Sequence, residues 1–188
     1  MKSIEIEKAI KEIDPIHFEG MINDIVKYLY KSEEIKHVEK IGMSHGSLRT
    51  KKGTPDIKLL TSDKNIAIQC SVEKNISTKI DNDIQKCLDL CREQKEILHE
   101  ICFCYNGNIS VEKIQDITEK LKKQNISFRF IGIDDIRRLI YLECPIIAHD
   151  WLNIPLSNGS LISLKNYEET CKFKSEHDAM FLYREKDK

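Results

Sequence analysis

The residues best suited to chemistry lie in one short stretch, which runs from Gly53 to Lys74 and reads GTPDIKLLTSDKNIAIQCSVEK. Asp56 opens an apolar run there, and Pro55 restrains the backbone just before it. A second apolar run ends in polar side chains, namely Gln69, Ser71, Glu73 and Lys74. Oxygen ligands that converge on a divalent cation allow it to polarise a phosphate and to lower the pKa of a bound water. The stretch is therefore a candidate site for metal-dependent cleavage of phosphodiesters.

Two neighbouring strands are predicted here, one from each apolar run. Because side chains alternate with a period of two along a strand, Gln69 and Ser71 share one face, and Glu73 joins them if the strand continues. Pairing of the two strands would place that face beside Asp56. Glu19, on the preceding predicted helix, could add a third oxygen ligand.

Hydrophobic periodicity predicts the elements that must hold these residues. Helices are expected over 6–13, 17–32, 77–94, 110–124 and 134–142. Strands are expected within 34–46, 55–60, 65–72, 97–106 and 126–133. Helices that alternate with strands late in a chain require parallel crossovers. The predicted fold class is α/β, with a mixed β-sheet flanked by helices.

The bulk composition fits a soluble globular protein of one domain. The chain has 188 residues, of which 40% are hydrophobic, and its net charge is -1. With so little net charge, a site for a polyanion must come from local clustering of basic residues. The sequence has no apolar run of about 20 residues and no hydrophobic core of a signal peptide at its start. We therefore expect a cytoplasmic protein that does not enter a membrane.

The seven cysteines do not predict a metal centre. No CxxC pair occurs, and no cysteines and histidines have the spacing of a zinc finger. We expect buried free thiols that pack as small hydrophobic side chains.

Basic residues flank the candidate site on both sides. Arg49, Lys51 and Lys52 lie in a glycine-bearing loop just before the Pro-Asp pair, where they either contact a phosphate backbone or are simply solvated. Further along, the helix face opposite the apolar stripe is predicted to carry three charged residues, which either line the same cleft or form salt links with each other, namely Lys79, Asp83 and Lys86.

In element order over roughly residues 15–105, the chain resembles the PD-(D/E)xK nuclease superfamily, which has the restriction-endonuclease-like fold. The motif residues are Glu19, the Pro55-Asp56 pair and the segment Gln69-Cys70-Ser71. More narrowly, GTPDIKLL, NIAIQCSVEK and KIDNDIQKCLDL are similar to a bacterial nuclease-like branch that precedes NTPase modules in antiphage-type proteins. The final FLYREKDK is similar to the sequence that often opens such modules.

The chain departs from the superfamily pattern at two positions. The pattern has Asp or Glu where Gln69 stands and Lys where Ser71 stands. An amide oxygen can still bind magnesium but brings no charge, and a serine cannot replace an ammonium group. Glu73 could restore the carboxylate and Lys74 the positive charge by reaching back from beyond the strand, or the two are a solvated pair at a strand end.

The resemblance implies a DNA endonuclease that depends on Mg²⁺ or Mn²⁺, forms a homo-oligomer and belongs to a longer chain. It implies catalytic roles for Asp56, Gln69, Glu73 and Lys74. The implied metal ligands are Asp56, Gln69 and Glu19, and the implied contacts to the DNA backbone are Arg49, Lys51, Lys52 and Lys79.

Two functions from different classes remain open at this point. The first is a metal-dependent endonuclease domain over 1–155, the effector of an antiphage defence protein, with 156–188 as a linker or the start of a following module. The second is a module of the same fold that has lost catalysis and serves in nucleic-acid binding or oligomerisation. Gln69 and Ser71 favour the second function, whereas Asp56, Glu73, Lys74 and the basic loop favour the first.

Overall fold

The computed structural model describes residues 2–41 and 55–156. The basic loop with Arg49, Lys51 and Lys52, and the segment 157–188, lie outside these residues. The elements in chain order are α1 (Ser3–Glu12), α2 (Pro15–Leu29), β1 (Ile35–Lys40), β2 (Ile57–Thr61), β3 (Asn65–Ser71), α3 (Ile76–Gln94), β4 (Glu100–Tyr105), α4 (Val111–Lys122), β5 (Ser127–Ile131), α5 (Ile133–Leu142) and α6 (Pro145–Leu152).

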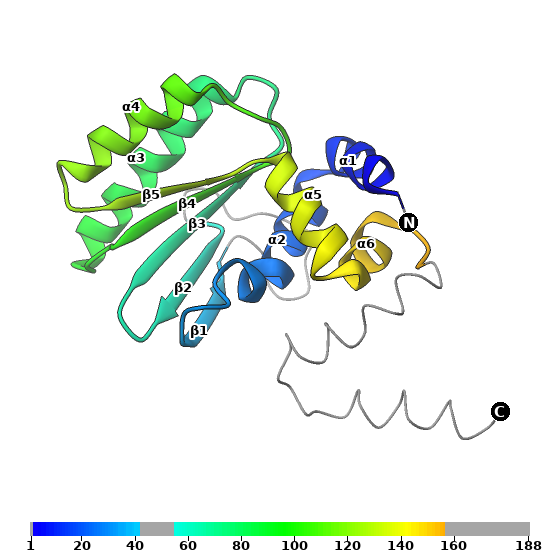
Figure 1. Ribbon diagram of the computed structural model, residues 1–188. Coiled ribbons are helices and arrows are strands. Elements are labelled where there is room, and N and C mark those ends of the chain that lie inside the picture. The colour runs from blue at the N-terminus through cyan, green and yellow to red at the C-terminus, as the bar shows by residue number, and fades with distance from the viewer. Residues whose placement is uncertain (1, 42–54, 157–188) are drawn as a thin grey trace.

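The five strands form one mixed sheet in the order β1-β2-β3-β4-β5 (Figure 1). β2 pairs antiparallel with both β1 and β3, while β3, β4 and β5 run parallel. The two parallel connections are made by α3 and α4, as expected for helical crossovers. The predicted α/β class with a mixed sheet is confirmed.

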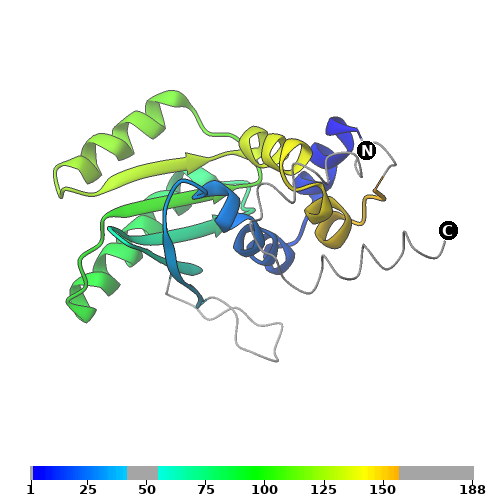
Figure 2. The same cartoon turned by 60° about the horizontal axis from the view of Figure 1, so that its bottom comes forward.

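Helices cover the sheet on both faces, and each face has its own hydrophobic core (Figures 1 and 2). Ile66 and Ile68 of β3 belong to the core that α1, α2, α5 and α6 build on one face. Ala67, which lies between them in sequence, belongs to the core under α3 and α4. Burial on both faces explains why β3 is a continuous apolar run. It also fixes the face of every later residue in this strand.

The structure differs from the predicted elements in two places near the candidate site. β3 ends at Ser71, so Glu73 lies beyond the strand and does not share its face. Asp56 precedes the first residue of β2 rather than lying within the strand.

The short helix α6 was not predicted. Its sequence, PIIAHDWL, is apolar almost all round and therefore lacks the amphipathic pattern on which helix prediction depends. Trp151 of α6 packs against Gly20 of α2, where a Cβ atom would stand 2.2 Å from the indole ring. Glycine at this position therefore permits the close approach of the two helices.

The cysteines behave as predicted within the described residues. All six of them are free and buried, namely Cys70, Cys87, Cys91, Cys102, Cys104 and Cys144. No helix of residues 2–41 and 55–156 is both long and apolar enough to cross a membrane.

Candidate functional site

Asp56 is anchored at the junction of β2 and β3. One of its carboxylate oxygens, Oδ2, accepts a hydrogen bond of 2.6 Å from the backbone N–H of Cys70. The antiparallel register pairs Ile57 with Ile68, so one step further along Asp56 stands opposite Gln69. Asp56 is 9% exposed, which is low for a carboxylate without a cationic hydrogen-bond partner.

Gln69 faces helix α3. The thiol of Cys87, on α3, donates to Oε1 of Gln69 at 3.6 Å. Burial raises the pKa of the Cys87 thiol to about 12, and the charge of Asp56 adds to this effect. The structure thus places Asp56 opposite Gln69 on the neighbouring strand, with Gln69 in contact with α3.

Ser71 closes the strand. Its side chain is buried, and its Oγ accepts a hydrogen bond of 3.2 Å from the backbone N–H of Glu73. This is the local turn that serine favours where a strand ends. Ser71 therefore supports the backbone at the position where the superfamily pattern has a lysine.

Glu19 approaches the site from helix α2. It is 8% exposed, and its Oε2 has no hydrogen-bond partner within the described residues. Burial raises the pKa of Glu19, while the positive charges of Lys40 and Lys79 lower it. α2 begins where the side chain of Asp14 caps the first turn, followed by a proline at the first helical position.

The electrostatics of Asp56 reflect its burial, to which neighbouring negative charges add. Burial raises the pKa of Asp56 to about 7, and the charges of Glu19 and Asp83 raise it as well. The hydrogen bond from Cys70 and the charge of Lys79 lower the pKa, but they do not compensate. Acids from α2 and α3 therefore act on Asp56 in a poorly solvated place.

Asp83 is a member of the site that sequence reasoning placed on the exposed face of its helix. It is 3% exposed; Oδ1 lies 2.9 Å from Nζ of Lys86, and Oδ2 lies 3.7 Å from Nζ of Lys79. The sequence did contain a pattern that could have found it. Asp83 follows Ile80 by three residues and precedes Cys87 by four, so it falls within the apolar stripe.

The residues beyond β3 are more exposed. Oε1 of Glu73 lies 3.9 Å from Nζ of Lys79, although the side chain of Glu73 is 61% exposed. Lys74 is exposed, and no ion pair joins it to an acid in the described ranges 2–41 and 55–156.

The donor chemistry of the site suits a hard divalent cation. Within the described part of the chain, no three or more His, Cys, Asp or Glu residues are arranged to hold a metal ion by themselves. Glu19 and Asp56 supply carboxylates, and Gln69 supplies an amide oxygen, which is the class of ligand that Mg²⁺ takes up. The buried Oε2 of Glu19, which has no hydrogen-bond partner within the described residues, fits a bound cation.

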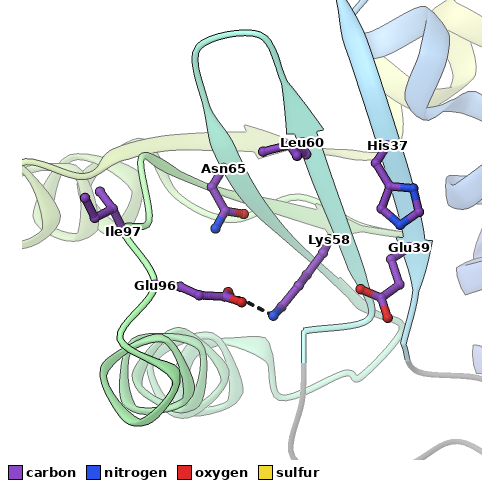
Figure 3. A pocket seen from close by; sticks show the side chains of 7 residues that line it. All are labelled: His37, Glu39, Lys58, Leu60, Asn65, Glu96 and Ile97. Atoms are coloured by element: carbon purple, nitrogen blue, oxygen red, sulfur yellow. Dashed lines mark hydrogen bonds and ion pairs between the residues drawn. The ribbon is translucent and has the colours of Figure 1, made fainter.

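A separate hollow lies elsewhere on the sheet (Figure 3). It has a volume of about 310 Å³, and two of its lining residues, Lys58 and Glu96, form an ion pair of 2.9 Å. Its lining comes from β1, β2, the start of β3 and the segment that follows α3, namely His37, Glu39, Lys58, Leu60, Asn65, Glu96 and Ile97. None of the predicted site residues lines it, so it is distinct from the acid site.

Comparison with known proteins supports the fold. No family model and no curated protein matches the chain. Among solved structures, the chain is similar to the small subunit, R.BspD6I2, of the heterodimeric restriction endonuclease R.BspD6I, with a TM-score of 0.53 and 16% sequence identity. The match covers 91% of this chain and 95% of the small subunit. At this identity the likeness concerns the fold alone, and the chain has a restriction-endonuclease-like fold.

Proposed function

We propose that the chain is a divalent-metal-dependent DNA endonuclease domain. One observation carries the proposal: on a sheet of restriction-endonuclease-like topology, a buried acid just before β2 stands opposite Gln69 and is acted on by the charges of two further buried acids, from α2 and α3. These acids, namely Glu19, Asp56 and Asp83, are each less than a tenth exposed. Uncompensated buried carboxylates are costly unless a cation or a proton neutralises them.

The reaction is hydrolysis of a phosphodiester. The oxygen of a water molecule forms a bond to phosphorus, the bond from phosphorus to one bridging oxygen breaks, the water loses a proton to solvent, and the leaving oxygen gains one. Mg²⁺ or Mn²⁺ supplies Lewis acidity and a more acidic bound water. Asp56, Glu19 and the amide oxygen of Gln69 would hold the ion. Asp56 is fixed for this role by its hydrogen bond to the backbone of Cys70.

The test is cleavage of supercoiled plasmid DNA with magnesium or manganese, with and without EDTA. We expect nicking that EDTA abolishes. Asp56→Ala should remove it, since a charged ligand is lost. Asp89→Ala is the matched control, because Asp89 is an exposed acid of α3 that pairs with Arg92. Circular dichroism of both variants verifies folding.

The same assay can also contradict the endonuclease proposal. If the wild type never nicks DNA with either metal, and Asp56→Ala binds DNA and Mn²⁺ as well as the wild type, the endonuclease proposal is wrong.

A second function is favoured by one specific observation, the neutral Gln69 and Ser71 at the end of β3. Under this second function, the domain keeps the fold but serves in nucleic-acid binding or oligomerisation without cleaving DNA. Gln69→Glu separates the two functions, because the added charge strengthens metal binding at a working site and should raise the cleavage rate or the affinity for Mn²⁺. Gln69→Ala should lower activity less than Asp56→Ala does.

The wider setting follows from the resemblance of the sequence and from the structural neighbour. We propose DNA as the partner, a homo-oligomeric assembly and a role as the effector of an antiphage defence protein in the cytoplasm. The neighbour is the small subunit of a heterodimeric restriction endonuclease, which supports DNA as the partner and assembly with a further subunit. The C-terminal FLYREKDK supports a further module beyond the domain of residues 1–155.

A further inference from the structure

Strand β3 lacks the positive charge that a phosphodiesterase site of this kind uses. Ser71 is buried and accepts a hydrogen bond from the following turn, so it offers the phosphate no cation. A positive charge near the scissile phosphate stabilises the additional negative charge of the transition state. The charge must therefore come from another element.

We propose that Lys79 of helix α3 supplies this positive charge to the phosphate at the Asp56 site and that Asp83 is the residue that positions it. The proposal rests on the proposed endonuclease function. It replaces the expectations that Lys74 is the catalytic lysine and that Lys79 only contacts the DNA backbone.

The position of Lys79 distinguishes it from the other lysines. Its Nζ lies 3.7 Å from Oδ2 of Asp83 and 3.9 Å from Oε1 of Glu73, so it forms an ion pair with each of these two acids. Its charge acts on both Asp56 and Glu19. The side chain is 36% exposed, which leaves the ammonium accessible to a ligand.

The hydrogen-bonding capacity of Lys79 is still open. Both of its ion-pair distances exceed the range of a hydrogen bond, and within the described residues its Nζ donates to no acceptor. An ammonium group has three donors, so all three remain for phosphate oxygens. Lys86 differs, because its Nζ already donates to Oδ1 of the same Asp83 at 2.9 Å.

Asp83 acts through Lys79 rather than on the substrate. It is 3% exposed and places one oxygen toward each of the two lysines. Lys79 and Asp83 are four residues apart and share one helix face. Their ion pair of 3.7 Å keeps the ammonium group near the site, although the two groups are too far apart for a hydrogen bond. The same face carries Cys87, which contacts Gln69, so the helix is fixed against β3.

The experiment compares Lys79→Gln with Lys86→Gln, the matched control that loses a bond to the same Asp83. With saturating DNA and Mn²⁺, Lys79→Gln should lower kcat by about 10²-fold or more, with an unchanged Kd for DNA. Lys86→Gln should keep the kcat of the wild type. Asp83→Asn should lower kcat less than Lys79→Gln does. Ser71→Lys added to Lys79→Gln should recover part of the rate, because it returns a lysine to the α3 side of β3.

Three outcomes overturn the proposal. Equal losses in Lys79→Gln and Lys86→Gln would show a structural effect through Asp83. A weaker Kd for DNA with kcat intact would assign Lys79 to the DNA backbone. A loss in Lys74→Gln with none in Lys79→Gln would assign the role to Lys74.

A metal-binding measurement separates failure of this proposal from failure of the endonuclease function. The positive charge of Lys79 repels a divalent cation bound by the nearby acids. Lys79→Gln should therefore bind Mn²⁺ about threefold to tenfold more tightly than Lys86→Gln in calorimetry without DNA. If the wild type cleaves nothing but this difference is present, the endonuclease function fails while Lys79 belongs to the cation site. If the two variants bind Mn²⁺ equally, Lys79 lies outside the site and the proposal is wrong.

Discussion

At the scale of single residues, the energetics of the site are dominated by a buried acid. Asp56 has a pKa raised from its ordinary value of 3.8 to about 7, mainly by burial. Its charged form is thus less favourable in the folded protein than in the unfolded chain. The unfolding free energy of the metal-free protein should therefore fall as the pH rises from about 4 to about 7.

Asp56→Asn tests this dependence, because asparagine keeps an oxygen for the N–H of Cys70 but does not titrate. Near pH 4 the variant and the wild type should have similar stability. Near pH 8 the variant should be more stable by roughly 1–3 kcal/mol, since one pKa unit corresponds to about 1.4 kcal/mol. Urea unfolding in EDTA at several pH values gives these numbers. A difference that does not change with pH would show that the carboxylate is not destabilised by burial.

The sequence predicted the strand residues of this site better than those on helix α3. Asp56 and Gln69 could be paired in advance, because a short turn and a period of two determine which residues of adjacent strands meet. The contributions of Lys79 and Asp83 depend on how α3 packs against β3. That packing is set by tertiary contacts such as the one between Cys87 and Gln69, which the helical pattern alone does not specify.

At the scale of elements, the contact between α2 and α6 holds the helix that carries Glu19. Trp151 lies against Gly20, and its Nε1 donates a hydrogen bond of 2.9 Å to Oδ2 of Asp24. Residues of α2 therefore contact the indole on adjacent turns. α6 was missed because its apolar sequence has no helical period, yet it braces the element next to the site.

Gly20→Ala should destabilise the protein by about 1–3 kcal/mol. Alanine would ordinarily favour a helix by about 1 kcal/mol over glycine, but its Cβ would stand 2.2 Å from the rigid indole, so the packing cost dominates. Trp151 is the single tryptophan of the chain, and its fluorescence during urea unfolding reports the change directly. A stability equal to or above that of the wild type would mean that α6 shifts without cost.

At the scale of the whole molecule, the net charge of -1 cannot attract DNA by itself. Affinity for a phosphate backbone must come from a local group of basic residues. The sequence offers one such group just before the Pro-Asp pair, namely Arg49, Lys51 and Lys52. These lie outside the described residues, so their contact with DNA stays a prediction that solution measurements must test.

Replacing Arg49, Lys51 and Lys52 together with alanine should weaken DNA binding evenly across sequences, because phosphate contacts carry no base information. Each lost contact should reduce the slope of log affinity against log salt by about one unit. A matched control removes the same charge elsewhere, by alanine at the exposed Lys120, Lys122 and Lys123. These lie on or just after α4, which packs against β5 at the sheet edge opposite β1. Filter binding over a salt series decides the outcome: equal slopes for the two triple variants would assign the loop to plain solvation, whereas a lower slope for the loop variant alone would place the DNA backbone beside Asp56.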